Sequence, residues 1–215
     1  MKKVNLKAVL GVAALVAALT VGGIYAYLTF TQSVTNTFTV GNVAATLTEP
    51  NWDAAEAGAH ENIYPGQSFA KDPTITIGSS SNAAVVFMEV TYPVQNVITI
   101  AQDGSKNAAA DTQLFTPGTL GTGWVELEAK KSTGTGTVTK VYGLNNELPA
   151  EGTSTLFNEV TFANVAEGQV VNSLDIVVKA DVIQAGGMAK AGATYTTEEL
   201  GAIYDKFVAQ NATTE

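Results

Sequence analysis

The chain lacks cysteine and arginine altogether, and its 215 residues include one histidine, His60. Without thiols, disulfide scaffolds, thiolate zinc sites and cysteine catalysis are excluded, and one histidine cannot supply two imidazole ligands within a subunit. Positive charge is scarce, since 11 lysines stand against 20 acidic residues and the formal net charge is -9. Nucleic-acid binding is excluded as well, because no basic surface exists to neutralise phosphates.

Charged residues are nearly absent from the N-terminal region. After lysines at positions 2, 3 and 7 no charge appears until Glu49, and the stretch that ends at Ala26 is largely apolar. This order predicts a helical secretory signal peptide over residues 1–26, cleaved between Ala26 and Tyr27. The alternative is an uncleaved anchor, because a helix of this length, at about 1.5 Å per residue, can just span a bilayer.

Alternating apolar and polar residues dominate the rest of the chain, residues 27–215. The runs are rich in Val, Ile, Thr, Phe and Tyr and are separated by Gly, Asn, Asp and Pro, which is typical of β-strands and turns. We expect strands at 35–40, 43–48, 74–77, 84–92, 97–100, 124–128, 137–142, 157–162 and 175–183. This pattern predicts an all-β fold, a single jelly-roll-like β-sandwich domain.

One expected strand, 84–92, is apolar on both faces. Val86, Met88 and Val90 share one face, while Val85 and Phe87 share the other. A strand of this kind is buried on both sides, so we expect it at the centre of a sheet.

Two further segments stand apart from the strand pattern. Residues 102–122 are rich in Gly, Ala, Thr and Asp, which predicts a long loop or insertion at one end of the sandwich. Near the C-terminus, Thr196 and Glu199 have the spacing of a capping box. The residues at helical spacing behind them are apolar, namely Leu200, Ile203, Tyr204 and Phe207. We therefore expect one short helix over residues 197–208.

The residues around His60 begin like a zinc-protease helix motif. Tyr64 stands where that motif needs its second histidine, so the motif supplies too few ligands for a catalytic zinc. Asp53, Glu56 and His60 could still meet on one helical turn and bind a divalent ion weakly, against the plainer interpretation of a solvated acidic loop. We predict no enzyme, no catalytic or metal site and no cofactor.

A second partial motif, in residues 103–107, places oxygen-bearing side chains at the first, third and fifth positions of a calcium loop. The sixth position is Ala108 instead of glycine, and the twelfth is Leu114 instead of glutamate. The segment therefore predicts an Asp-Gly turn.

Several short segments carry a resemblance only as a set. They are Ala26-Tyr27-Leu28-Thr29, Asn36-Thr37-Phe38-Thr39-Val40-Gly41-Asn42-Val43, Pro65-Gly66-Gln67, Lys71-Asp72-Pro73, Ala84-Val85-Val86-Phe87-Met88-Glu89-Val90, Tyr142-Gly143, Leu156-Phe157 and Ala180-Asp181-Val182-Ile183-Gln184-Ala185. Together, over nearly the full chain, they resemble the TasA/camelysin family of Gram-positive bacteria. The resemblance implies export through a SipW-type signal peptidase and a jelly-roll protein of the biofilm matrix or cell surface. It also implies that some members form fibres in which the N-terminal segment of one subunit completes the sheet of the next.

Residues 27–40 have properties that suit such a donor strand. They contain neither charge nor proline and, at about 3.3 Å per residue, reach roughly 46 Å, enough to cross a sandwich. The expected donor side chains are Tyr27, Leu28, Phe30, Val34, Phe38 and Val40. The expected acceptor groove involves Val86, Met88 and Val90. The alternative is an ordinary first strand that pairs within its own domain.

The leading hypothesis is a secreted, non-enzymatic structural protein of the biofilm matrix that polymerises by strand donation. Its partners would be further copies of itself, a SipW-type signal peptidase and other matrix proteins, with membrane contact only through an uncleaved signal segment. The second hypothesis is a monomeric surface adhesin or binding module anchored by that segment. A camelysin-like metalloprotease is the third.

Overall fold

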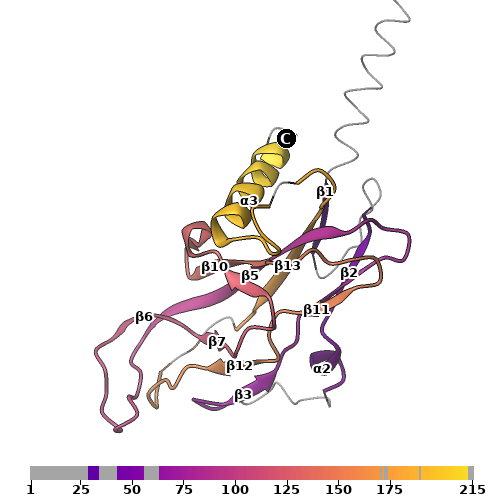
Figure 1. The fold of residues 1–215 in the computed structure, drawn as a ribbon. Helices are drawn as coiled ribbons and strands as arrows, with labels where there is room; N and C mark the ends of the chain where they lie inside the picture. Colours follow the sequence, from indigo (N-terminus) through magenta and orange to yellow (C-terminus); the bar gives the residue numbers. More distant parts are fainter. Residues whose placement is uncertain are drawn as a thin grey trace, which may run out of the picture.

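A computed structural model of the chain describes residues 29–33, 43–55, 63–169, 171, 174–188 and 190–212. These residues form antiparallel β-sheets in two layers, with one long helix against the outer side of the larger layer (Figure 1). The expected all-β sandwich with a C-terminal helix is confirmed. The expected signal helix and its cleavage site between Ala26 and Tyr27 lie outside the described residues.

The first layer is a seven-stranded sheet in the order β1-β13-β5-β10-β8, with β6 paired to β5 and β9 paired to β10. Its strands are β1 (Thr29–Ser33), β13 (Val177–Gln184), β5 (Ala84–Val97), β10 (Thr137–Leu144), β8 (Trp124–Glu126), β6 (Ala110–Gln113) and β9 (Ser132–Gly134). The strand β1, closest to the N-terminus, therefore lies at one end of this order, next to a strand from near the C-terminus.

The second layer consists of two three-stranded sheets, β11-β4-β2 and β3-β12-β7. Their strands are β11 (Thr153–Thr155), β4 (Thr74–Ile77), β2 (Ala45–Thr48), β3 (Ser68–Ala70), β12 (Glu159–Phe162) and β7 (Phe115–Pro117). A short helix, α2 (Pro50–Asp53), follows β2, and a 3-10 helix, η1 (Glu128–Lys130), follows β8. Buried apolar side chains from all three sheets form one core between the layers.

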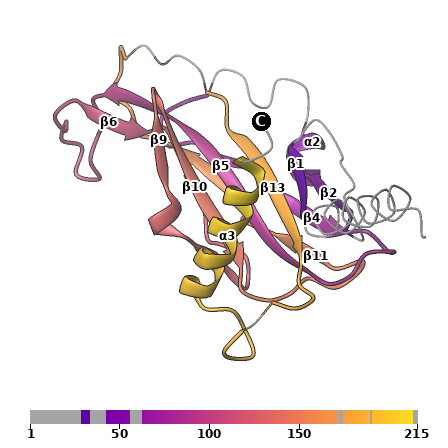
Figure 2. The ribbon, with the colours of Figure 1, turned by 90° about the horizontal axis from the view of Figure 1, so that it is seen from above.

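Strand β5 is buried on both faces, as its sequence predicts. Val86, Met88 and Val90 belong to the core between the layers. Val85 and Phe87 point to the other side, where they pack in a second apolar cluster beneath helix α3 (Thr197–Ala212). Viewed from above, α3 lies across β10, β5 and β13 (Figure 2).

The start of α3 is fixed by the capping box that its sequence indicates. The main-chain N–H of Thr196 donates to Oε2 of Glu199 at 2.8 Å, and the N–H of Glu199 donates to Oγ1 of Thr196 at 3.2 Å. The helix runs four residues beyond the expected end at Val208, to Ala212. None of the helices in the described part of the chain is long and apolar enough to span a membrane.

Residues 102–122, expected as a loop, contain the short strands β6 and β7. Leu114, between these strands, and Phe115, the first residue of β7, are buried, so core packing holds a segment whose composition indicates a loop. The expected turn at Asp103 is present, because its Oδ1 accepts hydrogen bonds from the N–H and the hydroxyl of Ser105 at 2.9 and 2.7 Å.

Candidate functional site

The pairing of β1 with β13 is the structural feature that bears on strand donation. The two strands are antiparallel, with Thr29 opposite Ile183, Phe30 opposite Val182 and Ser33 opposite Lys179. Among the described residues no strand pairs with the other edge of β1. The edge of β13 thus accepts an N-terminal strand of this chain through its main chain.

Only one of the predicted donor residues, Phe30, lies in the described part of the chain, where its backbone belongs to β1. The other predicted donor residues, Tyr27, Leu28, Val34, Phe38 and Val40, lie outside it, so the extent of the donor segment stays a prediction.

The predicted acceptor residues lie one strand further inward. Val86, Met88 and Val90 are fully buried in β5, opposite Val182, Ala180 and Val178 of β13. Strand β13 thus separates them from β1. Their part in an acceptor groove stays a prediction, whereas the strand in contact with β1 is β13.

A cavity of about 360 Å³ opens beside the first residues of β13. Its apolar lining includes Leu174, Ile176 and Val178 in and before β13. Phe69 of β3 and Phe115 of β7, in the other layer, line it as well. The volume falls within the range of ordinary small-molecule pockets, about 300–1,000 Å³. Asp175 and Val177 also line it, and both side chains are exposed. The lining is therefore largely apolar.

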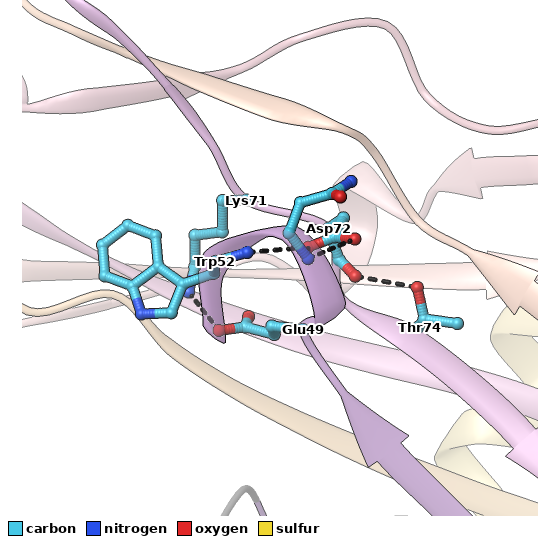
Figure 3. A network of polar contacts seen from close by, with 6 residues as sticks. Glu49, Trp52, Lys71, Asp72 and Thr74 are labelled. Atoms are coloured by element: carbon cyan, nitrogen blue, oxygen red, sulfur yellow. Dashed lines mark hydrogen bonds and ion pairs between the residues drawn. The ribbon is translucent and has the colours of Figure 1, made fainter. Parts of the chain in front are cut away.

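Two of the lining residues, Glu49 and Lys71, form a buried ion pair, which Figure 3 shows with its neighbours. Nζ of Lys71 is 2.8 Å from Oε2 of Glu49, and the two side chains are only 5% and 9% exposed. The ammonium group also lies 4.7 Å from the centre of the Trp52 ring, within range of a cation–π interaction. Among the described residues, Oε1 of Glu49 has no hydrogen-bond partner although it is buried. One carboxylate oxygen of the pair is thus enclosed by protein atoms without a hydrogen-bond partner.

The neighbouring Asp72 fixes the orientation of α2 (Figure 3). Its carboxylate accepts hydrogen bonds from the main-chain N–H groups of Asn51, at 2.9 Å, and Trp52, at 3.3 Å. These N–H groups open the helix and have no partner within it, so a carboxylate there is favourable. The hydroxyl of Thr74 donates to the main-chain oxygen of Asp72 at 2.8 Å. In the segment Lys71-Asp72-Pro73, which carries part of the family resemblance, Lys71 thus lines the cavity and Asp72 holds α2 beside it.

The sequence analysis missed Glu49 and the role of Lys71. The two residues are separated by 22 positions, and neither belongs to a recognised motif. One feature of the sequence does mark Glu49. It is the first charged residue after a long uncharged stretch, and it directly follows an expected strand.

A second polar cluster connects β5, β13 and α3. The hydroxyl of Tyr204 donates to Oε1 of Glu89 at 2.7 Å, and Nζ of Lys179 lies 3.3 Å from Glu89 and 3.2 Å from Oδ2 of Asp181. Burial raises the pKa of Glu89, but the Tyr204 hydrogen bond and the Lys179 charge outweigh it and hold that pKa below its usual value. The cluster therefore ties the helix to the two central strands.

The described residues include no group of three or more Asp, Glu or His placed to hold a metal ion. Asp53 is exposed at the end of α2, and Tyr64 is 63% exposed. His60 and Glu56 lie outside the described residues, so the weak ion site considered for them stays a prediction.

Comparison with known proteins adds one positive finding. A family model described as camelysin metallo-endopeptidase matches residues 1–112, just over half of the chain. This part includes β1, the Glu49–Lys71 pair, all of β5 and most of β6. Searches of curated proteins and of solved structures gave no significant match.

Proposed function

Because the chain belongs to the camelysin metallo-endopeptidase family, which includes the TasA proteins, we propose that it is a secreted structural protein that polymerises by strand donation. In this proposal it is non-enzymatic, and the N-terminal strand of one subunit pairs with the β13 edge of the next. The observation that supports it most directly is the pairing of β1, a strand at the end of the sheet order, with β13.

The chemistry of this pairing favours exchange between subunits. An edge strand binds through main-chain hydrogen bonds, so the same edge accepts the same strand from its own chain or from another. The five residues of β1, Thr-Phe-Thr-Gln-Ser, carry no charge that would oppose the approach of a second subunit. Head-to-tail exchange that does not close into a ring gives a filament when the same contact repeats.

The test is deletion of residues 27–36 from the full chain, expressed in a secreting Gram-positive host and recovered from the medium. We expect negative-stain microscopy to show filaments for the unaltered protein and none for the deletion variant. Circular dichroism should still report a folded β-protein. Filaments formed by the deletion variant would refute strand donation.

A peptide supplies the matched control. The synthetic peptide of residues 27–40 should bind the deletion variant and leave it monomeric, because the peptide fills the β13 edge without carrying a further acceptor. A peptide with proline at both 31 and 32 should not bind. Successive N–H groups of a strand point to opposite sides, so one of the two prolines removes a donor to β13 in either phase.

Secretion is tested on the same samples. The family match supports a secreted or cell-surface protein, and the proposal places the mature N-terminus at Tyr27. Intact-mass measurement of medium and cell fractions should find this species in the medium. A full-length species held in the cell fraction, without filaments, would favour the anchored adhesin instead.

The family description makes a metallo-endopeptidase the second candidate. That activity requires a metal, so peptide cleavage would be lost on chelation and in His60→Ala. The structural proposal predicts that filament formation is unchanged in both cases. Cleavage by the purified protein that is lost in both cases would favour the peptidase.

A further inference from the structure

The cavity beside the first residues of β13 is large enough to hold a small molecule. Its volume of about 360 Å³ equals the liquid volume of roughly twelve water molecules, at about 30 Å³ each. An organic molecule of roughly ten non-hydrogen atoms therefore fits. Concave sites with mostly apolar walls and a few polar groups are where proteins usually bind such molecules. The chemistry of the walls then determines which class of molecule is bound.

Most of the walls favour an apolar body. Val160 of β12 is buried, and the rings of Phe69 and Phe115 add aromatic surface. Two further apolar lining residues are partly open to solvent, since Ile176 is half-buried and Val177 is 55% exposed. Exposed apolar side chains that continue into a concave apolar surface are typical of a ligand site.

The charges in the lining disfavour an anion. The ammonium group of Lys71 and the carboxylate of Glu49 are 2.8 Å apart and compensate each other. Asp175, which also lines the cavity, is exposed and carries a negative charge. The whole chain has a formal net charge of -9. An anionic molecule would thus be repelled on its approach, whereas a neutral molecule is not.

Lys71 provides a hydrogen-bond donor in the lining. Its side chain is only 5% exposed, and an ammonium group carries three N–H donors. Among the described residues, Nζ has one hydrogen-bond acceptor, Oε2 of Glu49 at 2.8 Å (Figure 3). A second N–H group can point towards the ring of Trp52, whose centre is 4.7 Å away. The third has no acceptor among these residues, which is unfavourable for a buried donor, so an oxygen atom of a bound molecule is favoured there.

We propose that this cavity binds a small neutral molecule that consists of an apolar body and one hydrogen-bond-accepting oxygen, such as an aromatic or branched ketone. The apolar body packs against Phe69 and Phe115, and the oxygen accepts a hydrogen bond from Nζ of Lys71. The inference is independent of strand donation, whose contact is the main-chain edge of β13.

Two probes of nearly equal size test the class of molecule, namely benzylacetone, a neutral ketone, and hydrocinnamate, the corresponding carboxylate. Isothermal titration calorimetry of the purified protein should show saturable binding of benzylacetone with one site per chain. Hydrocinnamate should bind at least about tenfold more weakly, because its negative charge is brought close to Glu49 and Asp175. Absence of saturable binding of benzylacetone, or equal or tighter binding of hydrocinnamate, would overturn the inference.

The double substitution Glu49→Leu with Lys71→Met tests the hydrogen-bond donor. It removes both charges together, so no unpaired charge stays buried and the fold should be kept, which circular dichroism checks. Benzylacetone should bind to this variant at least about tenfold more weakly, because its oxygen loses the donor. An unchanged affinity would show that Lys71 does not hold the oxygen, and the inference would fail.

Two single substitutions test the location of the site. Ile176→Trp places a larger side chain in the lining at a half-buried position, and it should abolish binding of benzylacetone. The matched control is Val208→Trp on α3, where the side chain is 43% exposed and far in sequence from the lining residues, and it should leave the affinity unchanged. Equal affinities of the two variants would show that the molecule binds elsewhere. Filament formation by the same variants is a separate measurement that bears on strand donation alone.

Discussion

The buried pair Glu49–Lys71 gives a quantitative test of the cavity wall. Lys71→Met removes the ammonium group and leaves the carboxylate of Glu49 buried without its ion-pair partner. Removing one member of a buried pair costs about 3–5 kcal/mol, because the remaining charge has lost its solvation and its partner. Loss of the cation–π contact with Trp52 adds up to about 2 kcal/mol. The free energy of unfolding should therefore fall by at least about 3 kcal/mol.

The double substitution Glu49→Leu with Lys71→Met should not lower the free energy of unfolding in this way. Replacement of a buried ion pair by apolar side chains is often neutral or stabilising, so the double variant should unfold within about 1 kcal/mol of the unaltered protein or be more stable. Urea unfolding, followed by tryptophan fluorescence, measures the free energy of unfolding of the single and of the double variant. An m-value equal to that of the unaltered protein checks that unfolding stays two-state. A cost below about 1 kcal/mol for Lys71→Met alone would refute the buried pair.

Three further expectations concern stability. Tyr204→Phe removes the hydrogen bond to Glu89 and should cost about 1–2 kcal/mol. Because the lowered pKa of Glu89 gives stability that is lost as pH falls through it, circular dichroism should show acid unfolding of this variant at a higher pH. Thr196→Ala should cost about 1 kcal/mol and speed hydrogen exchange in the first turn of α3. Met88→Ala should cost about 2–5 kcal/mol in urea unfolding, whereas Val177→Ala should change it by less than about 0.5 kcal/mol.

The sequence predicts those elements whose pattern is local. The alternation at residues 74–77 gives the bounds of β4, and the two apolar faces of 84–92 give the central place of β5. Thr196 and Glu199 mark the start of α3 because a capping box is confined to one helical turn. The strands β3 and β7, by contrast, are three residues long, too short to show a period. Both are held by pairing with β12, which no local pattern encodes.

The candidate site depends almost wholly on contacts between distant residues. An uncharged N-terminal segment is visible in the sequence, but its partner strand is not, because Thr29 and Ile183 are far apart in the chain. The acceptor prediction chose Val86, Met88 and Val90 because they are apolar. An apolar pattern indicates that a residue is buried, but it does not indicate which strand lies at the edge of a sheet. The Glu49–Lys71 pair likewise arises only when the end of β2 meets the end of β3.

Helix α3 has a consequence for the form of any assembly. Helix α3 lies over the large sheet (Figure 2). Its Leu200 and Phe207 pack against Val85 and Phe87, which would otherwise be exposed. Dry face-to-face stacking of sheets is the contact that builds layered amyloid, and it needs an uncovered, flat apolar face. With that face covered by α3, stacking of a second sheet onto it is sterically blocked.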